Sequence, residues 1–184
     1  MSEIRTLSQK QKKEVNVIAV SKKQSLDKIR LIANEGHKDF GENQINEIET
    51  KWIDLKEEFP HIRLHYIGTI QSRKTERIFE LCDEIHSVDR IKIVKQIKEL
   101  EKKFGIVKNY YIQVNTGNEL QKSGVMMNEV DEFIHTIRDE YNFSIDGLMC
   151  LPPQKDDPIK HFLTLQSIAE RYEINKLSMG MSGD

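Results

Sequence analysis

Val17-Ile18-Ala19-Val20-Ser21-Lys22 is the stretch that decides the fold, because it is a short apolar run that ends abruptly in a lysine. A run of this length, rich in valine and isoleucine, is typical of a strand buried on both faces. Side chains alternate along a strand, so Lys22 shares a face with Ile18 and Val20. Gln24 and Ser25 then begin a helical pattern. The lysine is therefore expected at the carboxyl end of a buried strand, just before a helix.

Lys22 occupies the position at which open sheets and barrels of the α/β class carry their chemistry. Burial favours the neutral form of an amine, and a neutral amine can attack an aldehyde to form a Schiff base. A lysine at a strand end can also simply extend its ammonium into solvent. These six residues alone leave both interpretations open.

Length and charge limit the class of protein. The chain has 184 residues, enough for one sizeable core and too few for two comfortable domains. Charged residues make up 32% of the chain, yet the formal net charge is only -2, which excludes the one-sided basic field of a nucleic-acid-binding protein. No apolar stretch approaches the ~18 residues of a membrane span, and the first residues lack a signal-peptide core. We therefore expect a cytoplasmic protein that binds neither nucleic acid nor membrane.

The two cysteines, Cys82 and Cys150, lie far apart and lack the spacing of metal ligands. Buried, reduced thiols in a cytosolic protein account for both of them. The sequence therefore predicts no metal site.

Strand-like apolar runs alternate with helical patterns along the whole chain. Seven such runs start near residues 17, 38, 64, 84, 110, 145 and 176. The predicted N-caps of the helices between them are Ser25, Asp89, Asn128 and Asp157, and Gly105 is a predicted helix end. Strict alternation at this spacing predicts parallel strands joined by helical crossovers. The natural architecture is an α/β fold of the (β/α)₈ TIM-type barrel class, with seven strands visible.

Polar or glycine residues follow the carboxyl ends of the predicted strands. They are Lys22, Asn43, Gly68, Asp89, Asn115 and Ser182. Residues at these positions would ring one mouth of a barrel. Turns are polar and rich in glycine in any fold, so the ring alone does not establish a binding site.

Seven short motifs occur in order at these strand ends. They are Ala19-Val20-Ser21-Lys22, Phe40-Gly41-Glu42-Asn43, His65-Tyr66-Ile67-Gly68-Thr69-Ile70-Gln71-Ser72, His86-Ser87-Val88-Asp89, Gln113-Val114-Asn115-Thr116, Gly147-Leu148-Met149 and Leu177-Ser178-Met179-Gly180-Met181-Ser182. Through these motifs the chain resembles the pyridoxal phosphate homeostasis proteins, the YggS/PROSC family, from about Val17 to its last residue. One tetrapeptide would be weak support, whereas seven in order form a specific pattern.

The resemblance implies a single cofactor-binding domain over residues 1–184, like the N-terminal domain of alanine racemase, which is fold type III of pyridoxal phosphate (PLP) proteins. It implies that Lys22 holds pyridoxal 5′-phosphate as a Schiff base, which favours the chemical interpretation of that lysine. It also assigns five further residues to the cofactor site. They are Asn43, Ser178, Met179, Gly180 and Ser182.

A phosphate dianion needs several converging N–H and hydroxyl donors, and Gly180 would let the backbone come close to it. His65 and His86 are expected to satisfy hydrogen bonds around the barrel rather than to act as bases. No catalytic residue is predicted.

Members of this family bind and distribute the cofactor, and no robust enzymatic reaction is associated with them. The resemblance therefore implies a monomeric protein of intracellular PLP homeostasis, with PLP as its ligand and PLP-dependent apoenzymes as recipients. The alternative is an amino-acid racemase of the same fold type. Such racemases add a C-terminal β domain and use a tyrosine base from the partner subunit, and these residues leave no room for that domain. A third hypothesis is a folding-impaired fragment without cofactor.

The chain departs from the family pattern after Ser182. The family continues there through a helix into an eighth strand with a Val-Arg-x-Gly motif. That strand supplies backbone donors to the phosphate and an arginine that faces the pyridine nitrogen, whereas this sequence ends at Asp184. We therefore expect a domain that is C-terminally incomplete, with unpaired edges on its first and seventh strands.

Overall fold

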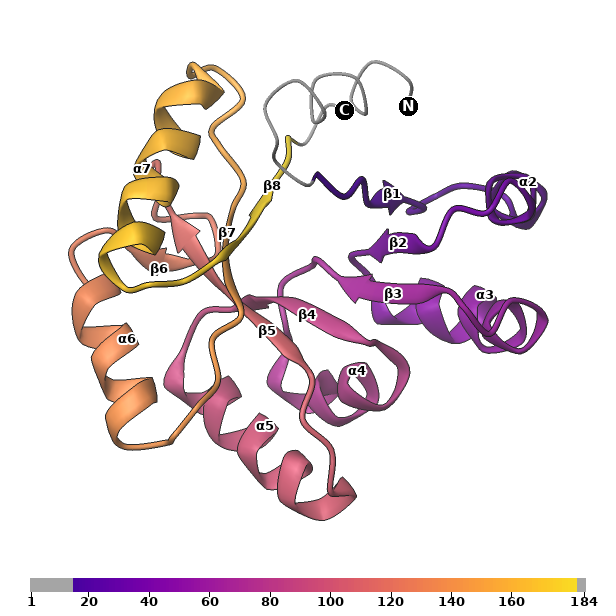
Figure 1. Ribbon diagram of the computed structural model, residues 1–184, viewed down its shortest axis with the longest axis horizontal. Coiled ribbons are helices and arrows are strands. Elements are labelled where there is room, and N and C mark those ends of the chain that lie inside the picture. Colours follow the sequence, from indigo (N-terminus) through magenta and orange to yellow (C-terminus); the bar gives the residue numbers. More distant parts are fainter. Residues whose placement is uncertain (1–14, 182–184) are drawn as a thin grey trace.

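The structure, a computed structural model, describes residues 15–181. Its centre is a curled sheet of parallel strands with the helices on the outer, convex side (Figure 1). The strands pair in the order β1-β2-β3-β4-β5-β7-β8, and the short β6 pairs with β5. Their bounds are β1 Ala19–Val20, β2 Asp39–Glu42, β3 Arg63–Tyr66, β4 Glu84–Val88, β5 Asn109–Asn115, β6 Val125–Met126, β7 Gly147–Cys150 and β8 Lys176–Met179.

Helices connect successive strands, as parallel pairing requires. Their bounds are α2 Leu26–Asn34, α3 Ile45–Glu58, the 3₁₀ turn η1 Ser72–Lys74, α4 Thr75–Leu81, α5 Ile91–Phe104, α6 Val130–Asp139 and α7 Pro158–Arg171. Each α-helix buries an apolar stripe against the sheet, and the stripe of α6 is Val130, Phe133, Ile134 and Ile137. The helices thereby close the core on the convex side.

Alternation along the strands gives the sheet two chemically different faces. On β5, Tyr110, Ile112 and Val114 belong to the apolar core beneath the helices. The residue between the first two, Tyr111, instead stacks on His86 with ring centroids 4.0 Å apart. The concave face of the sheet therefore carries the polar and aromatic groups that the helices do not cover.

The positions of the seven predicted strands and the fold class are confirmed. The first strand is not buried on both faces as predicted, because it spans only Ala19–Val20 at the edge of the sheet and Val20 is 43% exposed. Each of the seven predicted strand starts lies within two residues of an observed one. Among the described strands, β1 pairs only with β2, and β8 pairs only with β7, so hydrogen bonds do not close the sheet into a ring. The short β6 was not predicted, because two residues are too few to form a recognisable apolar run.

The predicted helix ends are partly right. Gly105 ends α5 with a left-handed φ of 68°, and Asp157 caps α7 by accepting a hydrogen bond from the amide of Ile159 at 3.0 Å. The predictions for Asp89 and Asn128 are wrong, because the N-caps are the next residues in the chain. Asp89 instead points its carboxylate at a neighbouring loop, which a local pattern cannot reveal.

Both cysteines are free and buried, as the sequence predicts. Burial raises the pKa of Cys82 to about 12 and that of Cys150 to about 11, so each remains an unreactive thiol at neutral pH. Within residues 15–181 no helix is both long enough and apolar enough to cross a lipid bilayer.

Candidate functional site

The end of β1, from which Lys22 extends, is fixed by its two neighbours. Ser21 is buried, and its Oγ donates a hydrogen bond to Oε1 of Glu42 at 2.7 Å. Lys23 adopts a left-handed φ of 59°, and its amide donates to Oε2 of Glu47 at 2.8 Å. These anchors define where the Lys22 side chain leaves the backbone, which matters because a covalent site needs a fixed geometry.

Lys22 itself is half-buried, and its ammonium makes no hydrogen bond or ion pair with any other residue between 15 and 181. The surface beside it is tightly packed and apolar. A Cβ placed on Gly41 would lie 3.0 Å from Cγ2 of Ile18 and 3.2 Å from Cδ1 of Ile67. Lys22 lies in the turn that follows β1, an edge strand of the sheet, and its amine is uncommitted among the described residues.

Asn43 and Gly68 meet at the carboxyl ends of β2 and β3. A Cβ on Gly68 would lie only 2.0 Å from the carbonyl oxygen of Asn43, so no other residue fits there. Ser87 Oγ donates to the carbonyl of Gly68 at 2.5 Å and fixes the contact from β4. The side-chain Oδ1 of Asn43 is buried and has no hydrogen-bond partner among the described residues. A buried acceptor without a partner is costly, and a donor from a ligand would satisfy it.

The end of β8 supplies Ser178, Met179 and Gly180. Oγ of Ser178 lies 2.8 Å from Nδ1 of His86 on β4. Met179 is 48% exposed, and a Cβ on Gly180 would meet no described atom within 4 Å. The backbone around Gly180 is therefore open to an approaching anion. Ser182, the last residue of the predicted site, lies outside the described residues.

A hollow of about 950 Å³ opens beside the ends of β2 and β3. Asn43, Gly68, Thr69, Arg73 and Lys74 are among its lining residues, so one side of it is basic. Lys22 and the segment 178–180 do not line this hollow. Of the described cofactor residues that the resemblance implies, Asn43 lines this hollow, whereas Lys22 and the segment 178–180 are at the two edge strands.

Two further members of the predicted ring hold a loop. Oδ2 of Asp89 accepts a hydrogen bond from the amide of Gly124 at 3.3 Å. Asn115 donates from Nδ2 to the carbonyl of Glu119 at 2.8 Å and accepts from the amide of Glu119 at 3.1 Å. These contacts shape the loop after β5, so Asp89 and Asn115 have structural partners already.

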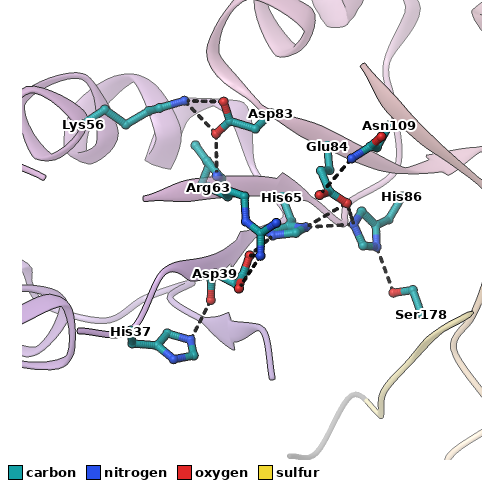
Figure 2. A network of polar contacts seen from close by, with 11 residues as sticks. His37, Asp39, Lys56, Arg63, His65, Asp83, Glu84, His86, Asn109 and Ser178 are labelled. Carbon is teal, nitrogen blue, oxygen red and sulfur yellow. Dashed lines mark hydrogen bonds and ion pairs between the residues drawn. The ribbon is translucent and has the colours of Figure 1, made fainter. Parts of the chain in front are cut away.

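A buried polar network crosses the concave face from β2 to β8 (Figure 2). Nε2 of His65 lies 3.0 Å from Oδ1 of Asp39, and Nδ1 of His65 lies 3.0 Å from Nε2 of His86. The other nitrogen of His86 reaches Ser178 on β8. The prediction that both histidines satisfy hydrogen bonds within the barrel is confirmed.

The hydrogen bonds assign the protons of the neutral network. Arg63 binds Asp39 with both contacts under 3.0 Å, and although burial alone would raise the pKa of Asp39, the hydrogen bonds from Arg63 and His65 hold it below its usual value. The ionised Asp39 can only accept, so His65 carries its proton on Nε2. Nδ1 of His65 then accepts from Nε2 of His86, whose Nδ1 accepts from the hydroxyl of Ser178.

Glu84 lies against both histidines. Its Oε2 is 3.7 Å from Nδ1 of His65 and 3.7 Å from Nε2 of His86, while Nδ2 of Asn109 donates to its Oε1 at 3.1 Å. Burial alone would raise the pKa of Glu84, but the hydrogen-bonding and charged groups beside it, His86 first among them, bring it down to about 2. Burial lowers the pKa of His86 below its usual value. Asp39 and Glu84 were not predicted as site residues, since both precede the strand ends on which the motifs lie.

Comparison with known proteins gives the same fold throughout. The family described as alanine racemase, N-terminal domain, matches residues 2–184. The chain is 33% identical over 180 residues to the pyridoxal phosphate homeostasis protein of Buchnera aphidicola subsp. Schizaphis graminum, which covers 94% of this chain and 78% of that protein. Its identity to the pyridoxal phosphate homeostasis protein of Vibrio alginolyticus is 35% over 180 residues, with 92% and 77% covered.

Solved structures agree with these relatives. The structure of PipY from Synechococcus elongatus PCC7942 with PLP bound matches with a TM-score of 0.78 at 26% identity, covering 98% of this chain and 89% of that one. Alanine racemase from Clostridium difficile 630 matches with a TM-score of 0.68 at 12% identity, covering 91% of this chain and 46% of that one. The second likeness extends to the fold alone.

Proposed function

Since this chain belongs to the alanine racemase N-terminal domain family, and within it to the pyridoxal phosphate homeostasis proteins, we propose that it binds pyridoxal 5′-phosphate and takes part in PLP homeostasis. The observation that carries the proposal is the match of almost the whole chain to these proteins and to PipY, a neighbour with PLP bound. The amine of Lys22, which has no partner among the described residues, also supports the proposal, because an uncommitted amine can react with the PLP aldehyde.

We assign the attachment of the cofactor to Lys22, and its further contacts to Asn43, Ser178, Met179, Gly180 and Ser182. Three features of the chain fit this group. The amine of Lys22 has no partner among the described residues, Oδ1 of Asn43 is an unsatisfied buried acceptor, and the backbone at Gly180 is open. When bound, PLP supplies an aldehyde that an amine can capture and a pyridine ring that can draw electrons. The anchored neighbours of Lys22 would orient that amine.

We propose that the protein holds and passes on the cofactor rather than using it for turnover. The names of its relatives describe homeostasis. We further propose a cytoplasmic monomer that delivers PLP to apoenzymes. The racemase hypothesis has no observation in its favour beyond the shared fold.

The test is reductive trapping. PLP is added to the purified protein, the adduct is reduced with borohydride, and peptide mapping locates the pyridoxyl group. We expect it on Lys22, and we expect Lys22→Ala to abolish the visible absorbance of the adduct. Lys28→Ala is the matched control, because Lys28 is an exposed lysine on the helix that follows and does not anchor the turn of Lys22. Labelling of another lysine with Lys22 unmodified would overturn the assignment, and absence of any adduct in the wild type would overturn the function itself.

A second experiment separates the carrier from the enzyme. The PLP-loaded protein is incubated with L-alanine and the D-isomer is measured over time. We expect no sustained racemisation. Turnover that persists over many cycles and disappears in Lys22→Ala would establish the racemase hypothesis in place of the carrier.

A further inference from the structure

The buried network contains three metal-ligating side chains whose inner atoms converge. These atoms are Nδ1 of His65, Nε2 of His86 and Oε2 of Glu84, and all three residues are buried. Their separations are 3.0, 3.7 and 3.7 Å. A point equidistant from three atoms with these separations lies about 2.0 Å from each of them, which is the length of zinc–nitrogen and zinc–oxygen bonds.

Each of the three side chains is also held from its outer side. Asp39 contacts Nε2 of His65 at 3.0 Å, Ser178 contacts Nδ1 of His86 at 2.8 Å, and Asn109 donates to Oε1 of Glu84 at 3.1 Å. Figure 2 shows these partners arranged around the outside of the cluster. Metal-ligating histidines almost always have such a partner on their second nitrogen, because it fixes the tautomer and the orientation of the ring.

From this arrangement we propose that His65, Glu84 and His86 form a binding site for a divalent transition-metal ion of the zinc type. Two imidazoles and one carboxylate are the ligand set of open zinc sites, in which a water completes the coordination. The site would lie inside the curled sheet, on the strands β3 and β4, and it is distinct from Lys22.

Glu84 faces both histidines at a distance set by its own partners, among them Asn109. Its Oε2 is 3.7 Å from each histidine nitrogen, which is too long for a hydrogen bond. A cation placed between the three atoms would contact all of them at once. Arg63 pairs with Asp39 at 2.7 Å, so the ligand carboxylate left to neutralise the metal is that of Glu84.

Metal binding needs little rearrangement of the protons. His65 already carries its proton on Nε2, toward Asp39, and offers Nδ1 as a lone pair. His86 must give up the Nε2 proton that it donates to His65. Its ring stays neutral if Nδ1 takes up a proton, which it then donates to Ser178. The Ser178 hydroxyl would then turn from donor to acceptor toward His86, with its own proton free for another partner.

Cobalt provides the direct test. The protein is dialysed against a chelator and titrated with Co²⁺, whose visible spectrum reports the coordination geometry, and Zn²⁺ is then added in competition. We expect one equivalent to bind with the bands of a four- or five-coordinate site, and zinc to displace it. X-ray absorption of the zinc form should show only nitrogen and oxygen ligands, with imidazole scattering.

Glu84→Gln and His86→Gln are expected to abolish stoichiometric binding, whereas His61→Gln, which alters an exposed histidine elsewhere, should not. Asp39→Asn keeps all three ligands and should weaken the affinity about 10–100-fold. Thermal unfolding of each variant without metal shows whether it is folded. No stoichiometric binding by the wild type would overturn the site, and so would cobalt bands that persist unchanged in Glu84→Gln and His86→Gln.

Discussion

Glu42 is a buried carboxylate directly beneath the turn that carries Lys22. It is fully buried, and its Oε1 accepts hydrogen bonds from Ser21 at 2.7 Å and from Nε1 of Trp52 at 3.3 Å. Its Oε2 has no partner among the described residues, and Nζ of Lys51 is 4.0 Å from Oε1. Burial is the main cause that raises the pKa of Glu42, against the hydrogen bonds from Ser21 and Trp52. The fold therefore carries a charge that it stabilises poorly.

Replacing Glu42 by glutamine should make stability less dependent on pH. Because the pKa of Glu42 is higher in the folded state than in the unfolded state, its favourable contribution is present at low pH and is lost as the pH rises through the folded pKa. We expect Glu42→Gln to unfold at higher urea concentration than the wild type at pH 8, with a smaller difference at pH 4. Urea titrations across that range measure this directly.

Glu47→Gln is the control of opposite sign. Burial would raise the pKa of Glu47, but the hydrogen bonds from Lys51 and from the amide of Lys23 lower it. Its contribution is present above the unfolded pKa and is lost as the pH falls, so the glutamine variant should be less stable at pH 7 and approach the wild type in acid. The same pH trend in both variants would contradict the assigned environments.

For a single residue, the sequence predicts the role of a side chain only when residues close to it in the chain indicate that role. The position of Lys22 just after the first strand follows from the apolar run that precedes it. The cluster of His65, Glu84 and His86 joins two strands 19 residues apart, and only the register of β3 against β4, which pairs His65 with Glu84, brings them together. The spacing of Glu84 and His86, two residues apart on one strand, was the local signal available.

Among the helices, two N-caps that look alike in sequence differ in the structure. Asp157 accepts a hydrogen bond from the amide of Ile159, whereas Ser25 stands at the N-cap of α2 without a side-chain hydrogen bond. Asp157→Ala should therefore cost about 1 kcal/mol of unfolding free energy, and Ser25→Ala much less. Chemical denaturation of both variants compares them. Equal losses would mean that the two caps do not differ in solution.

Strands were easier to predict than helix ends, for a physical reason. A buried parallel strand is a continuous apolar run, and the seven runs stand out against a highly charged background. The residue at which a helix begins depends on the group to which the candidate capping side chain hydrogen-bonds, and that group can lie far away in the sequence. Asp89 turns to the amide of Gly124, and the chain after Met126 makes a turn before α6 begins, so both helices start one residue later than predicted.

The proposed cofactor contacts lie at the two edges of the curled sheet. Lys22 follows β1, and Ser178 to Gly180 end β8, and these are the first and last strands of the curled sheet. β1 pairs with β2 through two residue pairs only, Ala19 with Phe40 and Val20 with Gly41. An edge with so short a ladder opens more readily than central strands such as β4 and β5.

Hydrogen exchange should reveal this difference. In the free protein we expect the amides of Val20 and Ser178 to exchange faster than that of Ile112, which lies in the central β5. Addition of PLP should slow exchange at the two edge strands and leave β5 nearly unchanged, because a ligand protects most what it holds. Slowing spread evenly over the sheet, or absent from β8, would contradict a site that uses both edges.

Bound at the proposed contacts, PLP would bridge β1 and β8, the two edge strands that hydrogen bonds leave unpaired with each other. With the contacts proposed here, bound cofactor would stabilise the folded form of β1 and β8, and its release would require one of these strands to open. Since coupling between two events is reciprocal, anything that loosens β1 or β8 weakens the hold on the cofactor, and the cofactor stiffens both strands in return. Under the proposed function, a recipient protein that opens either edge strand would release the cofactor without competing for Lys22 itself.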